Sequence, residues 1–595
     1  MEHNQLHKVR HSLAHLLAMA VLEHDPEAKL AIGPVIDEGF YYDFEFSEGK
    51  TPTDKDLKNF QKRIKKLASQ NLDFVYREIS SDDARKMFST EPYKAELIED
   101  LITDNKTLST YTSGIFTDLC SGPHVANTSE IATDAFKIDR VAGAYWRGDE
   151  KNKMLTRIYG IAFETKEDLD NYIYTREEAK KRDHRKLGKE LDLFTFSELV
   201  GGGLPLFTVR GTAMRNAIIN KIKSIQEEYG YQEVTIPHIT KPDLYKTSGH
   251  WEKFGDELFK VKGRESEFVM KPMNCPHHTQ IFASQARTYK DLPQRFMETT
   301  MVYRDEQSGE LLGLGRVRSI SQDDGHAFCT PEQVEQEIDN IVSVIKEFYT
   351  ALGMWNEGDF WVSLSTRDEE TMLGNPDNWD IAEKALADIA EKRNLKYTIV
   401  PGEAAFYGPK LDFMFKDSLG RERQLATVQL DFVMPERFGL EYVDADGTKK
   451  TPVMIHRAIA GSLERFLSII IEHFAGNFPT WLAPVQVDII PVQEEHNQYA
   501  QDIQKALKKI GVRTNCNTSN DGFGKKVRNS KNFKTPYFII VGDEDIQANS
   551  MTVEHRDNGK IGQMKLRIHC SYFKRTLDFL ENKKHLKLMR CFLFL

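Results

Sequence analysis

Four histidine and cysteine side chains in the first part of the chain have a spacing that could build one site. His11 and His15 lie four residues apart, which places both imidazoles on one face of a helix. Cys120 and His124 are also four apart, within a Gly-Pro segment that is typical of a turn. Three histidines and a cysteine could hold zinc tetrahedrally, or they could be ordinary surface side chains. Both interpretations stay open at this point.

Arginines gather around a second segment. Arg304, Asp305 and Glu306 are followed by a glycine-rich stretch, after which come Arg316 and Arg318. A hairpin built from these residues would present guanidinium groups that grip a phosphate through paired hydrogen bonds. The alternative is a plain hairpin with arginines on its surface.

A third segment, 457–465, is rich in small residues and is predicted to enter a helix. Ala458, Ala460, Gly461 and Ser462 would let a ligand approach the backbone closely, and Arg465 would then face that ligand.

Length and charge limit the class of protein. At ~100 to 200 residues per domain, a chain of 595 residues predicts three to five domains. With 80 basic and 90 acidic residues the net charge is -10, which excludes indiscriminate coating of nucleic acid. An RNA partner would have to meet a local basic run, such as 175–189 or 525–534, although either run is equally explained as a solvated helix face.

Composition predicts a soluble protein of the cytoplasm. The chain is 40% hydrophobic and 29% charged, with a mean hydropathy of -0.50, so it is neither disordered nor membrane-embedded. No apolar run reaches the ~18 residues that a membrane span needs, and the N-terminus is too polar for a signal peptide. Six scattered cysteines predict mostly free thiols, with one or two possible metal ligands.

Periodicity and composition divide the chain into elements that must position these side chains. Residues 5–24 are predicted to form an amphipathic helix with one buried stripe, from which His11 and His15 point away. The whole is an α+β multidomain chain. The predicted parts are a mixed segment 1–163, a basic connecting helix 164–187, a large antiparallel or mixed sheet with helices at 188–483, a compact α/β module at 484–575 and a tail at 576–595.

Ordered motifs resemble one enzyme family. The segments around Pro237, Arg304 and Arg465 resemble the three signature motifs of class II aminoacyl-tRNA synthetases, and within that class the chain is similar to the threonyl-tRNA synthetases. The more specific matches are MKPMNCPHH at 270–278, RVRSISQDDGH at 316–326, AAFYGPKLDF at 404–413, ATVQLDF at 426–432, MIHRAIAGSLERF at 454–466 and FPTWLAPVQV at 478–487. The resemblance implies an α+β editing domain, a class II antiparallel-sheet catalytic core and an anticodon-binding α/β domain.

The resemblance also implies an activity and its cofactors. It implies ATP-dependent ligation of L-threonine to tRNA(Thr) through a threonyl-adenylate, with Mg²⁺ accompanying ATP, one Zn²⁺ per subunit in the catalytic site, and a homodimer. The zinc would be held by Cys275, His326 and His456, with open positions for the substrate amine and hydroxyl, so that valine is rejected. The resemblance also implies which residues bind the substrates. The threonine substrate would be bound by Met273, Gln322, Asp324, Tyr407 and Gln429, and ATP by Arg304, Glu306, Arg316, Ile320, Lys410 and Arg465.

Transfer, editing and anticodon residues are implied in the same way. Arg304 and Arg465 would neutralise phosphate charge, and His250 would help deprotonate the terminal ribose hydroxyl with an ordinary pKa near ~6.5. Serine differs from threonine by one methyl, worth only ~10- to 200-fold in discrimination, so editing is expected. Editing is implied at His11, His15, Lys94, Asp118, Cys120 and His124, and anticodon contacts at Asn520, Arg528 and Lys534.

Departures from the family pattern leave a second hypothesis. The small extra N-terminal domain of the family is expected to be missing, Ile320 replaces the aromatic residue that stacks on adenine, and Lys534 and Glu554 replace arginines. An inactive, synthetase-like RNA-binding or regulatory protein is therefore the alternative to an active enzyme. A metal-dependent hydrolase is the alternative for the cluster around His11.

Overall fold

The computed structural model describes residues 4–565, and the predicted tail lies outside this range. The chain divides into two compact units, Met1–Glu177 and Glu178–Leu595. Within the described range, no helix is both long and apolar enough to cross a membrane.

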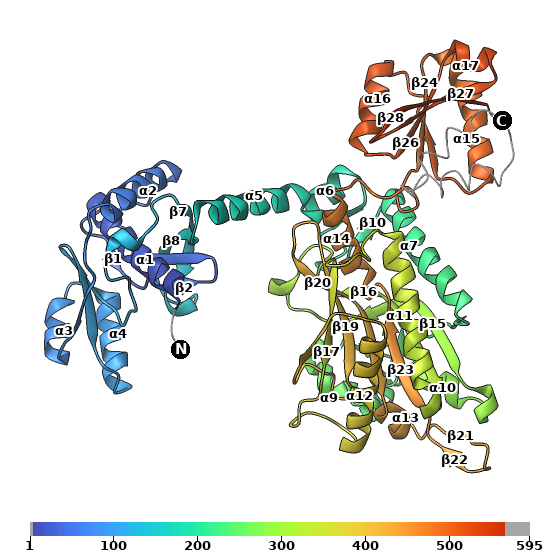
Figure 1. Ribbon diagram of the computed structural model, residues 1–595, viewed down its shortest axis with the longest axis horizontal. Helices are drawn as coiled ribbons and strands as arrows, with labels where there is room; N and C mark the ends of the chain where they lie inside the picture. Colours follow the sequence, from blue (N-terminus) through green and yellow to red (C-terminus); the bar gives the residue numbers. More distant parts are fainter. Residues whose placement is uncertain (1–3, 566–595) are drawn as a thin grey trace. The chain divides into compact units, whose positions relative to one another are not determined.

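The first unit places a long helix between a sheet and a second helix (Figure 1). Asn4 is the N-cap of helix α1, and its side chain accepts a hydrogen bond from the His7 N–H. A five-stranded sheet with the core order β1-β3-β8-β7 packs against α1, and a three-stranded sheet β4-β5-β6 completes the unit. The elements are α1 (Gln5–His24), β1 (Lys29–Leu30), β2 (Val35–Ile36), β3 (Gly39–Glu45), α2 (Asp54–Ala68), β4 (Val75–Glu78), α3 (Ser81–Met87), α4 (Pro92–Thr103), β5 (Ser109–Ser113), β6 (Phe116–Leu119), β7 (Phe136–Tyr145) and β8 (Met154–Ala162).

The prediction of a single buried stripe on α1 is wrong. The helix is buried almost continuously from Ser12 to Val21, because α2 covers one side while the sheet covers another. His15 is only 2% exposed, so the expectation that both helix histidines point away from the packed face fails for this residue.

The predicted connecting helix is present as two helices. They are α5 (Lys166–Arg182) and α6 (His184–Glu190). Asp183 separates them and caps α6, since its carboxylate accepts from the Arg185 N–H. Asp183 and Arg185 also form an ion pair at 2.5 Å, so part of the basic run is used within the fold.

An eight-stranded sheet organises the second unit, in the order β11-β15-β16-β23-β20-β19-β17-β18. Its pairs are antiparallel except at the two ends, β11/β15 and β17/β18. This agrees with the large antiparallel or mixed sheet expected from the sequence. The strands are β11 (Gln232–Glu233), β15 (Gln294–Tyr303), β16 (Ser319–Cys329), β17 (Phe360–Ser365), β18 (Tyr397–Val400), β19 (Lys410–Lys416), β20 (Glu422–Asp431) and β23 (Val453–Ala458).

Helices cover the two faces of this sheet unequally. Long helices pack over one face around a large aliphatic and aromatic core (Figure 1). Shorter helices pack on part of the opposite face around Phe282, Phe328 and Met454, leaving the rest of that face for a site. The long helices are α7 (Val209–Glu228), α11 (Val334–Ala351), α12 (Pro376–Lys392) and α14 (Leu463–Phe474), and the shorter ones are α8 (Pro242–Ser248), α9 (His250–Phe254), α10 (Cys275–Ala283) and α13 (Val433–Arg437).

The small residues of 457–465 lie before a helix rather than in it. Ala458 ends β23, and α14 begins only at Leu463, with the Ser462 side chain accepting from the Arg465 N–H as its N-cap. The expected helix start is therefore displaced by a tight turn, in which Gly461 has a left-handed φ of 64°.

The C-terminal module is the compact α/β module expected from the sequence. Its five-stranded sheet runs β25-β24-β26-β27-β28. The elements are β24 (Val487–Pro491), α15 (Asn497–Lys509), β25 (Thr514–Cys516), α16 (Phe523–Asn532), β26 (Tyr537–Val541), α17 (Asp543–Gln547), β27 (Ser550–His555) and β28 (Gly559–Lys565).

A buried ion pair fixes the centre of the large sheet. Arg457 on β23 is 2% exposed, and its Nη1 lies 2.9 Å from the Asp323 carboxylate on β16. The other oxygen of Asp323 accepts from the backbone N–H groups of Ile459 and Ala460. Gly325 makes room for this arginine, because a Cβ there would lie 2.2 Å from Arg457 Nη2.

Asp323→Asn should lower the stability of this unit by about 3 to 5 kcal/mol, because the buried Arg457 charge would lose its counter-charge. Thermal unfolding of the purified chain measures the effect. Glu335→Gln is the matched control, since Glu335 pairs with Lys392 where both side chains are largely exposed, and solvent screens such surface pairs so that they contribute little to stability. Equal shifts in the two variants would contradict the role of Asp323.

Candidate active site

The register of three strands brings the predicted zinc ligands together. His326 on β16 pairs with His456 on β23, and His456 pairs with Gln429 on β20. Paired residues of an antiparallel sheet point to the same face, so these side chains form one row. Cys275, the first residue of α10, approaches the row, and ligand atoms of Cys275, His326 and His456 lie within 4.8 Å of one another.

The surroundings of these three residues suit a metal. All three are buried, and the Nε2 of His456 lies 2.9 Å from the Asp431 carboxylate. The other oxygen of Asp431 accepts two backbone N–H groups of α13, so the carboxylate is held in place to orient the imidazole. One sulfur and two nitrogens, with room beside them, match the donor set of a catalytic zinc site.

Burial sets the protonation of these donors. It raises the pKa of the Cys275 thiol well above its usual value and lowers the pKa of His326 well below its usual value. Neutral imidazoles are the form that binds a metal, whereas the thiol would lose its proton to the cation. The donors present therefore fit zinc.

The residues expected around threonine lie beside this row. Asp324 precedes His326 by two positions on the same face of β16, and burial raises the pKa of its carboxyl. Its Oδ2 accepts from Asn274 Nδ2 at 3.1 Å. The Tyr407 ring centre is 5.2 Å from that of His456, and Gln429 Nε2 donates to the Gly408 carbonyl.

A cavity of about 580 Å³ lies beside the first residues of β16, before Asp324 and His326. Ile320 and Gln322 line it, and both lie on the same face of the strand as Asp324. Five of the six residues expected at ATP line this cavity: Arg304, Glu306, Arg316, Ile320 and Arg465. The sixth, Lys410, is not among its lining residues, and its Nζ donates to Asp412 Oδ2 at 2.6 Å.

Two of the arginines that line this cavity, Arg304 and Arg465, are desolvated cations. Burial lowers the pKa of Arg304 and of Arg465, and the nearby Arg423 lowers that of Arg465 further. An anion entering the cavity would relieve both groups. Arg304 also joins the two halves of the site, because its Nη2 lies 3.3 Å from the Met273 sulfur.

His250 does not have the ordinary pKa expected from the sequence. It is 2% exposed, and burial together with nearby cationic groups lowers its pKa to about 3. Its Nδ1 lies 2.8 Å from Ser248 Oγ, and its Nε2 is 3.8 Å from Cys275 Sγ. Its assignment to the transfer step stays a prediction.

The first unit carries the second cluster, three of whose four residues line another cavity. Cys120 Sγ lies 3.3 Å from His11 Nε2 and 3.3 Å from His124 Nε2. His15 lies beneath them, with its ring centre 4.3 Å from that of His124. The cavity, of about 680 Å³, is lined by His11, His15 and Cys120 but also by Lys94 and Asp118, so it gathers five of the six residues expected for editing.

Asp118 is the polar anchor of this cavity. Its two oxygens lie 2.6 Å from Lys94 Nζ and 2.6 Å from the Tyr42 hydroxyl, and all three side chains are buried. Tyr42 was not identified from the sequence. It lies on β3 between Tyr41 and Asp43, and no motif marks it.

Contacts predicted for the anticodon lie on the C-terminal module. Asn520 and Arg528 are exposed there. Lys534 is partly buried instead, and its Nζ donates to the Ala475 carbonyl. Asn520 and Arg528 are therefore available to a ligand, whereas Lys534 already has a protein partner.

Acid should destabilise the first unit through its histidines. Burial lowers the pKa of His11 to about 4 and lowers those of His15 and His124 as well. Below pH ~6.5 the unfolded chain binds protons that the folded chain excludes, so stability falls by up to ~1.4 kcal/mol per histidine per pH unit. Calorimetry at pH 7, 6 and 5 should show this loss, and His15→Leu should reduce its slope by about one third. A transition that does not change between pH 7 and 5 would contradict the buried neutral state.

Comparison with known proteins agrees with this geometry. Three family models match the chain: the tRNA synthetase class II core domain (G, H, P, S and T) at 259–474, an anticodon binding domain at 486–575, and the threonyl and alanyl tRNA synthetase second additional domain at 108–159. Each match falls inside one of the domains predicted from the sequence.

Whole-chain relatives point to one family. A threonine–tRNA ligase of Gloeobacter violaceus is 47% identical over 93% of this chain and 90% of its own length, and one of Porphyromonas gingivalis is 46% identical over 96% and 88%. The solved RNA binding domain of threonyl-tRNA synthetase from Cryptosporidium parvum Iowa II is 34% identical, with a TM-score of 0.63 over 67% of this chain and 98% of that one. The chain belongs to the threonine–tRNA ligase family of class II aminoacyl-tRNA synthetases.

Proposed function

We propose that the chain ligates L-threonine to tRNA(Thr) in two steps, through a threonyl-adenylate, and hydrolyses mischarged seryl-tRNA at a second site. One observation carries the proposal for the first site. Strand β16 carries Ile320, Gln322, Asp324 and His326 on one face, so the cavity that would take the nucleotide and the Cys/His group that would take the metal lie along one strand.

The amino-acid end of this surface can recognise an amine and a hydroxyl together. Zinc held by Cys275, His326 and His456 would supply open coordination positions for those two groups. Asp324, beside His326, would accept the substrate ammonium, and its burial makes that ion pair strong. Tyr407 and Gln429 would complete the walls, so that valine, which lacks the hydroxyl, leaves polar groups unpaired.

The nucleotide end is arranged for charge neutralisation. ATP would enter with Mg²⁺, and Arg304, which lines the cavity, also contacts Met273 at the proposed amino-acid end. There its guanidinium would hold the α-phosphate as the threonine carboxylate attacks, while Arg465 would hold the γ-phosphate. Glu306 accepts from Arg316 at 2.7 Å, which would orient that guanidinium toward the nucleotide. Ile320 would contact the adenine by dispersion alone.

Threonine-dependent pyrophosphate exchange tests the synthetic activity. We expect exchange with threonine, weaker exchange with serine and very little with valine. Zinc-loaded protein that binds tRNA but shows no exchange would instead favour the inactive RNA-binding alternative.

Cys275→Ser should abolish most threonine activation through loss of the metal. Hydroxyl is a far poorer zinc ligand than thiolate, so both metal content and exchange should fall, the latter by about 100-fold or more. Cys329→Ser is the matched control, because Cys329 is another fully buried cysteine, on β16, and belongs to the core on the opposite side. Full zinc and full activity in Cys275→Ser would refute the ligand assignment.

His11→Ala should separate editing from synthesis. His11 is partly exposed at the cavity, so its loss should cost little packing, whereas replacing the buried His15 would also open a void. We expect deacylation of seryl-tRNA to fall by about 100-fold while threonine exchange stays unchanged. His24→Ala, on the same helix, is the control.

Metal analysis of the same variants tests the hydrolase alternative for this cluster. Two zinc ions per wild-type chain, with one lost in His11→Ala, would favour a metal-dependent hydrolase. Undiminished deacylation in a folded His11→Ala protein would refute the editing assignment.

We further propose a cytoplasmic homodimer. The segment leading to Pro237 resembles the class II interface motif, and β11 within it lies at the edge of the eight-stranded sheet, where another chain can approach. Sedimentation of the full chain measures the assembly, and a mass near 68.4 kDa at micromolar concentration would count against the dimer.

A further inference from the structure

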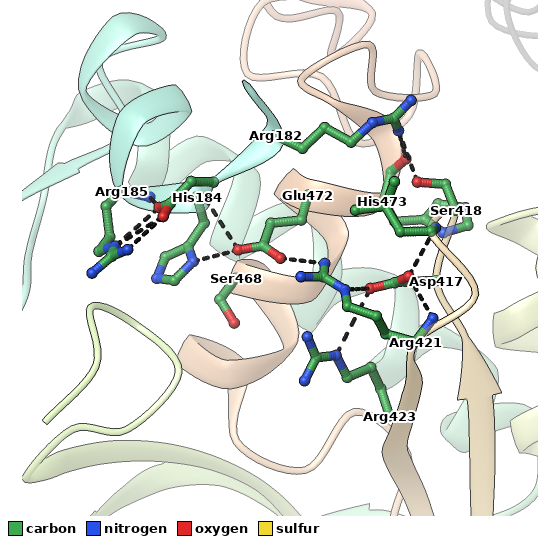
Figure 2. Close-up of polar contacts among 12 residues, drawn as sticks. Arg182, His184, Arg185, Asp417, Ser418, Arg421, Arg423, Ser468, Glu472 and His473 are labelled. Atoms are coloured by element: carbon green, nitrogen blue, oxygen red, sulfur yellow. Dashed lines mark hydrogen bonds and ion pairs between the residues drawn. The ribbon is translucent and has the colours of Figure 1, made fainter. Parts of the chain in front are cut away.

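A buried histidine, His184, contacts Glu472 on α14 (Figure 2) and also the loop 313–316 beside the cavity. His184, the first residue of α6, is 5% exposed. Its Nδ1 lies 2.8 Å from Glu472 Oε1 on α14, and its Nε2 accepts from the Leu314 backbone N–H at 3.1 Å. A backbone N–H can only donate, so Nε2 carries no proton, and the proton on Nδ1 is donated to the carboxylate. The two contacts select one neutral tautomer.

Glu472 is held firmly on its other side. Its Oε2 accepts from Arg421 at 2.5 Å, and Arg421 also donates to Asp417 at 2.6 Å (Figure 2). Burial alone would raise the pKa of Glu472, but hydrogen bonds from His184 and Arg421 outweigh it and lower the pKa. The carboxylate is therefore charged and fixed on α14, the helix that carries Arg465 in its first turn.

The loop that His184 contacts is shaped around the imidazole. Gly313 has a φ of 51°, and a Cβ there would lie 2.3 Å from His184 Nε2. The next side chain, Leu314, is fully buried. A Cβ on Gly315 would come within 3.9 Å of Ser468 Oγ, so the loop also lies against α14. Without His184, the Leu314 N–H would be buried with no acceptor.

The same loop forms a wall of the nucleotide cavity. Gly315 and Arg316 line the cavity directly, and Arg316 is paired with Glu306 across the loop. His184 itself is not among the lining residues of the cavity. It can therefore influence the nucleotide only through the backbone that it holds.

A metal site is the competing interpretation of this cluster, since atoms of Asp183, His184 and Glu472 lie within 4.8 Å of one another. Both imidazole nitrogens are already bonded, to Glu472 and to Leu314. The Asp183 carboxylate pairs with Arg185. A cation would have to break these contacts.

We propose that His184 is a positioning residue for ATP. By accepting from the Leu314 N–H it fixes the 313–316 loop, so that Arg316 faces the same nucleotide as Arg465. The inference rests on the proposed function in that it takes ATP as the occupant of the cavity.

Two substitutions each keep one of the two hydrogen bonds of His184 and remove the other. The amide nitrogen of Asn overlays Nδ1, so His184→Asn can still donate to Glu472 but offers nothing to the Leu314 N–H. The amide oxygen of Gln reaches the place of Nε2, so His184→Gln can still accept from Leu314 but loses the donor to Glu472. A positioning role predicts that the two variants differ in ATP binding, whereas a structural role predicts that they differ only in stability.

The measurement is the KM for ATP in threonine-dependent pyrophosphate exchange, with Tm recorded on the same preparations. His184→Asn should raise the KM by about five- to tenfold, the effect of leaving one buried N–H unpaired where the nucleotide binds. His184→Gln should stay within about twofold of wild type, while both variants lose Tm. Exchange by His184→Gln would also show that the proposed function holds independently of this inference.

Equal ATP KM values in the two variants would overturn the proposal, at whatever level they fall. A His184→Asn chain that fails to fold while His184→Gln folds would overturn it as well, because the Leu314 contact would then be structural. Absence of exchange in the wild-type chain would refute the proposed function instead.

Discussion

The register between β16, β23 and β20 is the constraint on which the synthetic site depends. It sets His326 opposite His456 and His456 opposite Gln429, and a slip by one residue would turn all of them to the other face. The buried pair Asp323–Arg457 opposes such a slip between β16 and β23, because it joins these two strands on their other side and also holds the turn before α14. The ion pair and the proposed zinc ligands therefore depend on the same pairing of β16 with β23 and lie on opposite faces of the sheet.

Contacts between α14 and distant parts of the chain fix residues that line the proposed nucleotide cavity. Its first turn carries Arg465, and its last turn carries Glu472, which is bonded to His184 and to Arg421. Because both ends of α14 are held by these contacts, the helix fixes the position of Arg465. The loop that contains Arg316 therefore has a fixed partner at each end, Glu306 near β15 and His184 near α6.

Local pattern and family resemblance together predicted most of the fold and the grouping of the site residues, but not how those residues are buried. The period of α1 indicated one stripe, because a sequence shows which residues are apolar but not that α2 and a sheet both cover the helix. For the same reason the pKa of His250 was misjudged, since Tyr407 and Cys275, which help to bury it, are far from it in sequence. His184 was visible only as part of a basic run.

The two Cys/His clusters show why composition alone does not identify a metal site. Around Cys275 the carboxylates of Asp324 and Asp431 are buried nearby and can balance a cation, and Asp431 orients His456. Around Cys120 the one buried carboxylate, Asp118, is already paired with Lys94, and burial raises the thiol pKa to about 12. His11 Nδ1 and His124 Nδ1 each have a partner, Pro123 O and Ser12 Oγ, while their Nε2 atoms meet at the thiol. Charge balance thus favours a cation at the first cluster, whereas the neutral groups of the second, with Lys94 beside them, suit an anionic RNA end and a water molecule.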